Sequence, residues 1–109
     1  SKRMEWVKVF SSSAEMREQL QEGDPRAVST GSQSICLVLW RGNLRAIASK
    51  CPHNGESLSK GTVNYLGEVI CPWHGYRFNL KNGREAVERC RDAETFPVKE
   101  NDEGVFVGL

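Results

Sequence analysis

Short stretches rich in hydrophobic residues recur along the 109-residue chain, and polar, turn-forming residues separate them. Trp6–Phe10 alternates apolar and polar residues, and a period of two residues is typical of a half-buried β-strand. The other stretches with strand signals are Arg26–Ser29, Ile35–Trp40, Leu44–Ala48, Gly67–Ile70, Tyr76–Leu80, Glu94–Lys99 and Val105–Gly108. Many short strands at close intervals predict an all-β protein, either a sandwich or a small barrel.

One segment near the N-terminus departs from the strand period and predicts a short helix. Ser12 and Glu15 have the spacing of a capping box, in which two side chains bond backbone N–H groups at the start of a helix. Met16 and Leu20 then lie on one face, and Gly23 follows at the expected end of the helix.

The turn signals indicate how the strands are joined. Lys81-Asn82-Gly83 is the strongest of them, because Asn-Gly tolerates the positive φ angles of a tight hairpin turn. Arg41-Gly42-Asn43 marks an earlier turn, and Asn101–Gly104 closes a last hairpin. Since no repeat or low-complexity segment divides the sequence, we expect a single domain over residues 1–109.

The charge and the apolar runs narrow the range of partners and compartments. Fifteen basic and 14 acidic residues give a net charge of +1, which disfavours nucleic acid and acidic membranes as partners. The longest apolar run, Ile35–Trp40, is far too short to span a bilayer, and no secretory hydrophobic region is present. We therefore expect a cytoplasmic protein. Because the sequence begins with Ser1 rather than Met, we also expect processing or a tag remnant, with a native start near Met4.

Two short segments carry the candidate chemistry. The first is Cys51-Pro52-His53, and the second is Cys71-Pro72-Trp73-His74. Each supplies one cysteine and one histidine, which is the ligand set of a cluster with two irons, one held by two thiolates and the other by two imidazoles. Structural zinc also accepts two cysteines and two histidines, but its usual spacings pair Cys with Cys and His with His. Zinc stays as the alternative.

With both segments in place, the chain resembles the Rieske 2Fe–2S family, and in particular its soluble, ferredoxin-like branch. The resemblance covers nearly the whole chain: Leu44–Ala48 with the segment 51–55, the segment 71–78, Phe96-Pro97-Val98, and Val105-Phe106-Val107. It implies an antiparallel β-sandwich with a small cluster-binding subdomain and one short helix. It also implies one 2Fe–2S cluster, in which Cys51 and Cys71 ligate one iron and His53 and His74 ligate the other.

Departures from the high-potential relatives predict a low reduction potential. Where those relatives carry a disulfide across the two loops, this sequence has Glu56 and Trp73. Where they place Ser and Tyr hydroxyls against the cluster, this sequence has Tyr76 and Phe78, and Phe78 lacks a hydroxyl. Fewer hydrogen bonds to the cluster lower its potential, so we expect a midpoint of roughly −150 mV, at the lower end of the Rieske range.

The remaining chemically notable residues have simpler interpretations. Cys36, inside an apolar run, is expected to be a buried thiol, and Cys90 an exposed one. Trp6 and Trp40 are expected in the core, while Trp73 is expected beneath its loop, with partner docking as the alternative. The charged segment 84–94, which lacks proline, is expected to be a solvated loop that leaves the cluster more open.

Two classes of function follow from the resemblance, an electron carrier and a catalytic oxygenase. An oxygenase needs a further iron, typically held by two histidines and a carboxylate. The chain has only two histidines, and the cluster uses both. We therefore expect a monomeric electron-transfer protein, not itself an enzyme, that passes electrons from a reductase to a terminal oxygenase. The alternative is a small Rieske subunit of a larger redox enzyme similar to nitrite reductase.

Overall fold

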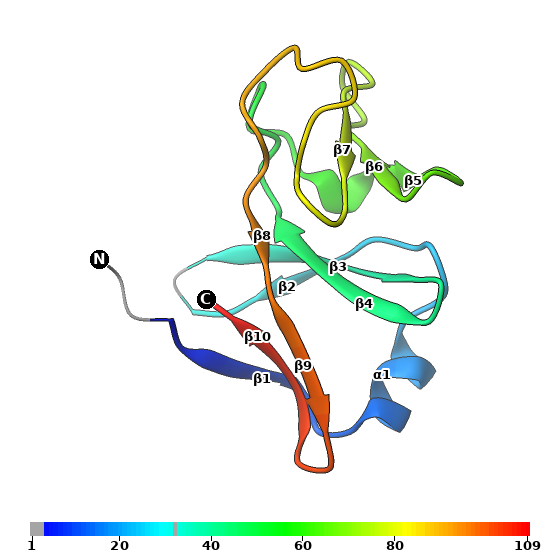
Figure 1. Cartoon of the computed structure of the whole chain (residues 1–109), viewed down its shortest axis with the longest axis vertical. Coiled ribbons are helices and arrows are strands. Elements are labelled where there is room, and N and C mark those ends of the chain that lie inside the picture. The colour runs from blue at the N-terminus through cyan, green and yellow to red at the C-terminus, as the bar shows by residue number, and fades with distance from the viewer. Residues whose placement is uncertain (1–3, 32) are drawn as a thin grey trace.

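A computed structural model describes residues 4–31 and 33–109, and Ser1 lies outside this part of the chain. Within it, ten strands form three antiparallel sheets, accompanied by one α-helix and one 3-10 turn at Leu58–Lys60 (Figure 1). The predicted all-β sandwich with a small extra subdomain is confirmed. None of the described helices is long and apolar enough to cross a membrane.

The first sheet of the sandwich joins the two ends of the chain. It contains β1 (Trp6–Phe10), β10 (Gly104–Gly108) and β9 (Val98–Asn101), in that order. The second sheet contains β2 (Arg26–Ser29), β3 (Ser34–Trp40), β4 (Asn43–Ala48) and β8 (Thr95–Phe96). The register pairs Leu37 with Ala46 across β3 and β4.

The structure divides one predicted strand into two. The stretch Glu94–Lys99 is split at Pro97, so that β8 pairs with β4 while β9 pairs with β10. Proline has no N–H to donate to a ladder, and it therefore interrupts the pairing. The chain passes from one sheet to the other at this point, a change that the pattern of apolar residues did not indicate.

The third sheet forms the small subdomain, at the upper end of the molecule in Figure 1. Its strands are β5 (Thr62–Val63), β6 (Glu68–Ile70) and β7 (Arg77–Asn79). The predicted turn at residues 81–83 follows β7, and the Gly83 N–H donates to the Asn79 carbonyl (2.7 Å). The returning arm pairs with β7 only through a bridge between Phe78 and Glu85. It then becomes the long loop 85–94, which arches over this end.

Strand β3 is buried on both faces, which explains its unbroken apolar run. One face, with Ile35, Leu37 and Leu39, packs in the core between the two large sheets. The other face, with Cys36 and Val38, packs against the small subdomain. The second core also contains Ile47, Leu58, Val69, Phe78 and Leu80 together with Cys51 and Cys71. The subdomain therefore rests directly on the sandwich.

The predicted helix is α1 (Ser13–Gln19), and its N-terminal cap is the predicted Ser12, whose Oγ accepts from the Glu15 N–H (3.0 Å). The Glu15 carboxylate bonds the Ser11 N–H (3.1 Å) instead of closing the box on Ser12. The helix ends at Gln19 with Leu20 as its C-terminal cap, and Gly23 lies past this end, where its N–H donates to the Leu39 carbonyl (2.6 Å).

Of the two tryptophans expected in the core, only Trp40 is partly buried. Trp6 is 38% exposed, because β1 is an edge strand whose outward face carries this side chain. The Lys99 ammonium lies 4.5 Å from the centre of its ring. This cation–π contact on the surface replaces the predicted core packing.

Candidate metal centre

The two ligand segments fold into loops of the same backbone design. Cys51 donates its N–H to Glu56 (2.8 Å) and accepts from the Gly55 N–H (2.8 Å). Cys71 likewise donates to Tyr76 (2.8 Å) and accepts from Gly75 (3.1 Å). Gly55 and Gly75 have φ angles of 76° and 73°, where L side chains are strained. A Cβ at either position would meet no protein atom within 4 Å, so among the protein's own atoms only the backbone conformation requires glycine.

The two cysteines lie at the inner side of these loops. Cys51 and Cys71 are both buried and belong to the same apolar cluster. Burial raises the pKa of the Cys51 thiol, and the neighbouring Cys71 contributes in the same direction. Asn54 joins the loops, since its Oδ1 lies 3.9 Å from Cys71 Sγ. Metal binding deprotonates a coordinating thiol outright, so a cationic cluster fits this buried pair.

The two histidines lie at the outer side, exposed to solvent. The ring centroids of His53 and His74 are 5.4 Å apart, with an angle of 68° between the planes. Trp73 places its ring edge-on to His74 at 5.7 Å. It is 66% exposed, so the expected packing beneath the loop is wrong.

The structure thus brings all four predicted residues to one end of the molecule, where the two cysteines form one pair and the two histidines form another. In the described part of the chain, no three Cys, His, Asp or Glu side chains converge as a single metal ion would require. A thiol pair inside and an imidazole pair outside fit a cluster in which each iron takes one pair. Tetrahedral zinc would instead draw all four donors to one point.

The family comparison decides between cluster and zinc. The model of the Rieske 2Fe–2S domain matches residues 5–97, which is most of the chain and includes both loops. The chain belongs to the Rieske 2Fe–2S domain family. Its cofactor is therefore one Rieske-type 2Fe–2S cluster, and the alternative of a structural zinc ion is excluded.

Three comparisons place this Rieske chain among its relatives. It is 37% identical over 91 residues to human apoptosis-inducing factor 3, covering 83% of this chain but only 15% of that protein. A solved complex of reduced oxygenase and oxidised ferredoxin in carbazole 1,9a-dioxygenase contains a chain that is 29% identical, with a TM-score of 0.78 and coverage of 94% and 91%. A putative NADH-dependent nitrite reductase small subunit from Mycobacterium tuberculosis shares the fold, at 19% identity, a TM-score of 0.82 and coverage of 99% and 97%.

One residue central to this end of the Rieske fold was missed by the sequence analysis. Glu85, placed in a solvated loop, is only 2% exposed. Its carboxylate accepts from the backbone N–H groups of Arg77, Val87 and Arg89 and from the Arg89 guanidinium. The guanidinium is the main reason that the pKa of Glu85 lies far below its usual range. In the sequence, Glu85 lies among acidic and basic residues, so the pattern did not indicate that its side chain is buried.

The two cysteines outside the motifs have no sign of reactivity. Burial raises the pKa of Cys36 to about 11, as expected of an inert core thiol. Cys90 is partly buried rather than exposed. Its pKa is raised by burial and by Glu85, which together outweigh Arg89 and Arg91. A redox role for Cys90 is therefore not supported.

Proposed function

We propose that this chain carries single electrons from a reductase to a terminal oxygenase. We further propose that Cys51 and Cys71 hold the inner iron of its cluster, and that His53 and His74 hold the outer iron. The observation that carries the proposal is the sorting of the four side chains, with thiols buried and imidazoles exposed. The bound cluster supplies reversible one-electron chemistry.

The protein contributes insulation on one side and access on the other. Around the thiols, Leu58, Val69 and Phe78 form an apolar shell that excludes water from the inner side. The exposed rings of His53 and His74 give a partner a short approach at the outer side. Electrons therefore enter and leave at the imidazole end.

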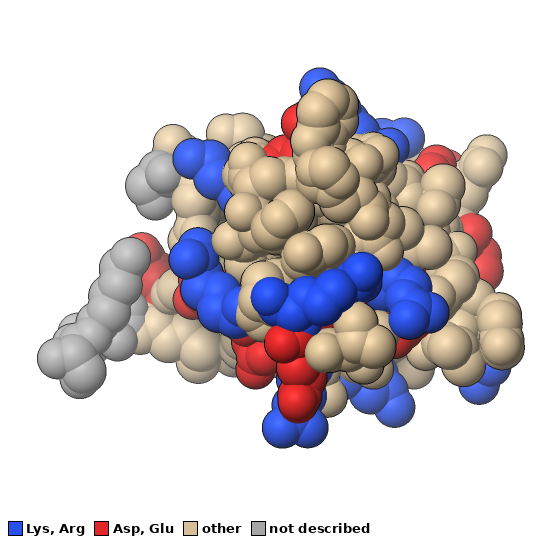
Figure 2. Space-filling model, turned by 90° about the horizontal axis from the view of Figure 1, so that it is seen from above, with Lys and Arg blue, Asp and Glu red and all other residues tan. Residues whose placement is uncertain are grey.

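The surface at this end supports a protein partner. Seen from above, a broad uncharged area is bordered by a band of Lys and Arg side chains (Figure 2). Such a surface favours a partner with an uncharged contact area and an acidic rim. The carbazole dioxygenase complex, in which ferredoxin binds oxygenase, supports the same class of partner. Electron transfer to such a partner should slow as salt is added.

The ligand assignment is tested by loading the full chain with iron and sulfide and recording visible and EPR spectra. We expect a Rieske spectrum from the parent, and its loss in His53→Ala, His74→Ala, Cys51→Ser and Cys71→Ser. Cys36→Ser and Cys90→Ser are matched controls that should keep the spectrum. A parent without the signal would refute the cluster, and an unchanged signal in a ligand variant would refute that ligand.

We propose a midpoint potential of roughly −150 mV for the cluster. Phe78 is fully buried and offers no hydroxyl, and the Tyr76 ring is stacked on His53. Both features reduce the hydrogen bonds available to the sulfur atoms, which keeps the potential low. A redox titration that gives a clearly positive midpoint would contradict this value.

The fold shared with the nitrite reductase small subunit favours a second candidate, a Rieske subunit of a larger reductase. Copurification and reduction assays with an oxygenase and with a reductase complex would distinguish the two.

We also propose a cytoplasmic monomer that binds neither nucleic acid nor membranes. The near-neutral charge supports this, as do the four cysteines, which all lie within the described residues and form no disulfide there. Light scattering and cell fractionation test it.

A further inference from the structure

A stacked pair of rings connects the two ligand loops. Tyr76 follows the second loop directly, whereas His53 belongs to the first. Their ring centroids are 4.0 Å apart and their planes differ by 15°, which is a stacked arrangement. Since Tyr76 is partly buried and begins the chain segment leading into β7, it offers His53 a flat surface that is fixed to the subdomain.

The other side of the Tyr76 ring carries a cation. The Arg89 guanidinium carbon lies 4.1 Å from the ring centre. Two groups that are both about 4 Å from the same centre cannot share one face, so Tyr76 lies between His53 and Arg89. Guanidinium groups stack well on aromatic faces, and the Arg89 side chain does so while 37% of it is exposed to solvent.

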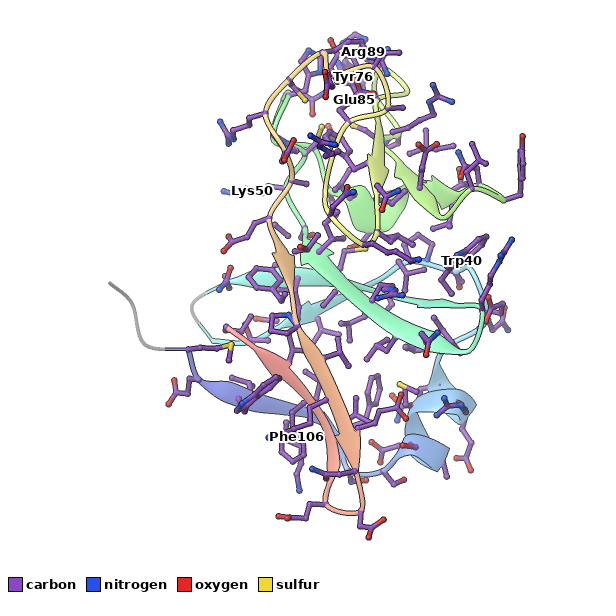
Figure 3. The ribbon with its side chains drawn as sticks, in the orientation of Figure 1. Trp40, Lys50, Tyr76, Glu85, Arg89 and Phe106 are labelled. Carbon is purple, nitrogen blue, oxygen red and sulfur yellow. The ribbon has the colours of Figure 1, made fainter. Side chains whose placement is uncertain are left out.

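A buried carboxylate holds this guanidinium in place. Glu85 binds Arg89 at two points, with Nε–Oε1 at 2.9 Å and Nη2–Oε2 at 2.6 Å. The same carboxylate accepts the backbone N–H groups of Arg77 and Val87, both at 3.1 Å, and of Arg89 at 3.0 Å. It therefore ties the loop 85–94 to the strand that follows the second ligand loop. Figure 3 shows Arg89, Tyr76 and Glu85 gathered at this end of the molecule.

We propose that Glu85 and Arg89 are positioning residues for the cluster. They hold the Tyr76 ring in contact with the His53 ring, and they place a fixed positive charge beside the outer iron site. The proposal rests on the ligand role of His53 proposed above. Its consequences are a single orientation of the His53 ring and a higher reduction potential than the chain would have without the guanidinium.

The sign of the effect follows from electrostatics. Reduction adds one negative charge to the cluster, and a nearby cation stabilises the reduced form. The guanidinium carbon lies at most about 8 Å from the His53 ring centre, given its 4.1 Å and 4.0 Å separations from Tyr76. At an effective dielectric constant of about 20, a unit charge at this range shifts a one-electron equilibrium by roughly thirtyfold. The Arg89 side chain is 37% exposed, and screening by solvent and salt reduces this value, so we expect a threefold to tenfold shift.

The test compares the midpoint potentials of the cluster-loaded parent, Arg89→Gln and Arg91→Gln. Arg91 is an exposed arginine two residues further along the same loop, so its variant removes the same charge without touching Tyr76. We expect Arg89→Gln to lower the potential by the stated factor, about 30–60 mV for a one-electron couple. Arg91→Gln should give less than a third of that shift. The EPR lines of Arg89→Gln should also broaden, because the His53 ring can then adopt more than one orientation.

Equal shifts in the two variants, or no shift in Arg89→Gln, would overturn the proposal. If Arg89→Gln loads no cluster, Arg89→Lys decides, because an ammonium keeps the charge but cannot make the two-point bond to Glu85. EPR lines broader than those of the parent support the proposal, and lines identical to those of the parent overturn it. A parent without a Rieske signal would instead refute the proposed function itself.

Discussion

The sandwich and the cluster-binding end of this protein are held together in different ways. In the sandwich, Ile35, Leu37, Val105 and Val107 are all fully buried, and apolar contact dominates. At the upper end, the loops that reach the surface depend on a charged hub, in which Glu85 accepts five hydrogen bonds from two backbone segments and one guanidinium.

The difference reflects what each region must expose. A sandwich that only supports the fold can bury every large side chain on its inner faces. An end that exchanges electrons with a partner, as proposed above, must leave His53, His74 and Trp73 open, so it has less apolar area to bury around them. A buried, fully bonded carboxylate supplies order there instead. Substitutions in the two regions should therefore separate stability from redox behaviour.

The largest loss of stability is expected from Leu37→Ala in the core of the sandwich. Removing a fully buried Leu side chain leaves a cavity and costs about 3–5 kcal/mol of unfolding free energy. Urea unfolding measures this loss. The midpoint potential of the folded protein should stay at the parent value, and a shift as large as that of Arg89→Gln would show that the two regions are not separable.

A smaller loss is expected from Gly83→Ala, at the base of the loop 85–94. A Cβ there would lie 1.8 Å from the Ala93 carbonyl oxygen, and the φ angle of 76° adds strain. Together these cost about 2–4 kcal/mol. The matched control is Gly23→Ala, with φ of 75° and open space around it, which should cost about 1–2 kcal/mol in urea unfolding. Equal losses would show that the close approach of Ala93 is easily relieved.

Next comes Glu85→Gln, which removes the charge from the hub. We expect a loss of about 1.5–3 kcal/mol at pH 7, since hydrogen bonds to a charged acceptor are weakened. The folded pKa of Glu85 is lowered, so its contribution is complete above the unfolded value of about 4.3 and is lost as pH falls toward the folded pKa. Urea unfolding at pH 7, 5.5 and 3 should therefore show the gap between parent and variant narrowing only at pH 3. A constant gap would mean that the charge is not responsible.

The smallest effect on stability is expected from Trp73→Ala. The side chain is 66% exposed, so the unfolding free energy should change by less than about 0.5 kcal/mol. Its position beside His74 predicts that stopped-flow electron transfer to an oxygenase partner slows instead. Trp6→Ala, on strand β1 of the sandwich, is the control that should leave the transfer rate unchanged. Equal rates in the parent and Trp73→Ala would exclude docking through this side chain.

The comparison also shows why some features were predictable from the sequence. Strands β1 and β2 match the predicted bounds. For β1 the reason is its alternation with a period of two, which depends only on which side chains face the core. The cap at Ser12 was predictable because it involves a neighbour three residues away. The Cys and His pairs were recognisable because each loop presents its donors within a few residues of sequence.

Other features depend on contacts between distant segments, and they became visible only in the tertiary structure. The burial of both faces of β3 requires two different partners, and the exposure of Trp6 requires β1 to be an edge strand. The chain changes sheets at Pro97 because the residues before it pair with β4 and the residues after it pair with β10.

The sequence by itself determined the all-β character and the capped helix, since these follow from residue spacing. Its donor residues limited the metal centre to a cluster or zinc, and the family match decided for the cluster. Only the tertiary structure decided that Glu85 is buried and that Tyr76 lies between Arg89 and His53. These residues come from three loops, and a charge is buried only where folding assembles enough donors around it. That requirement is met in space and leaves no pattern in the linear chain.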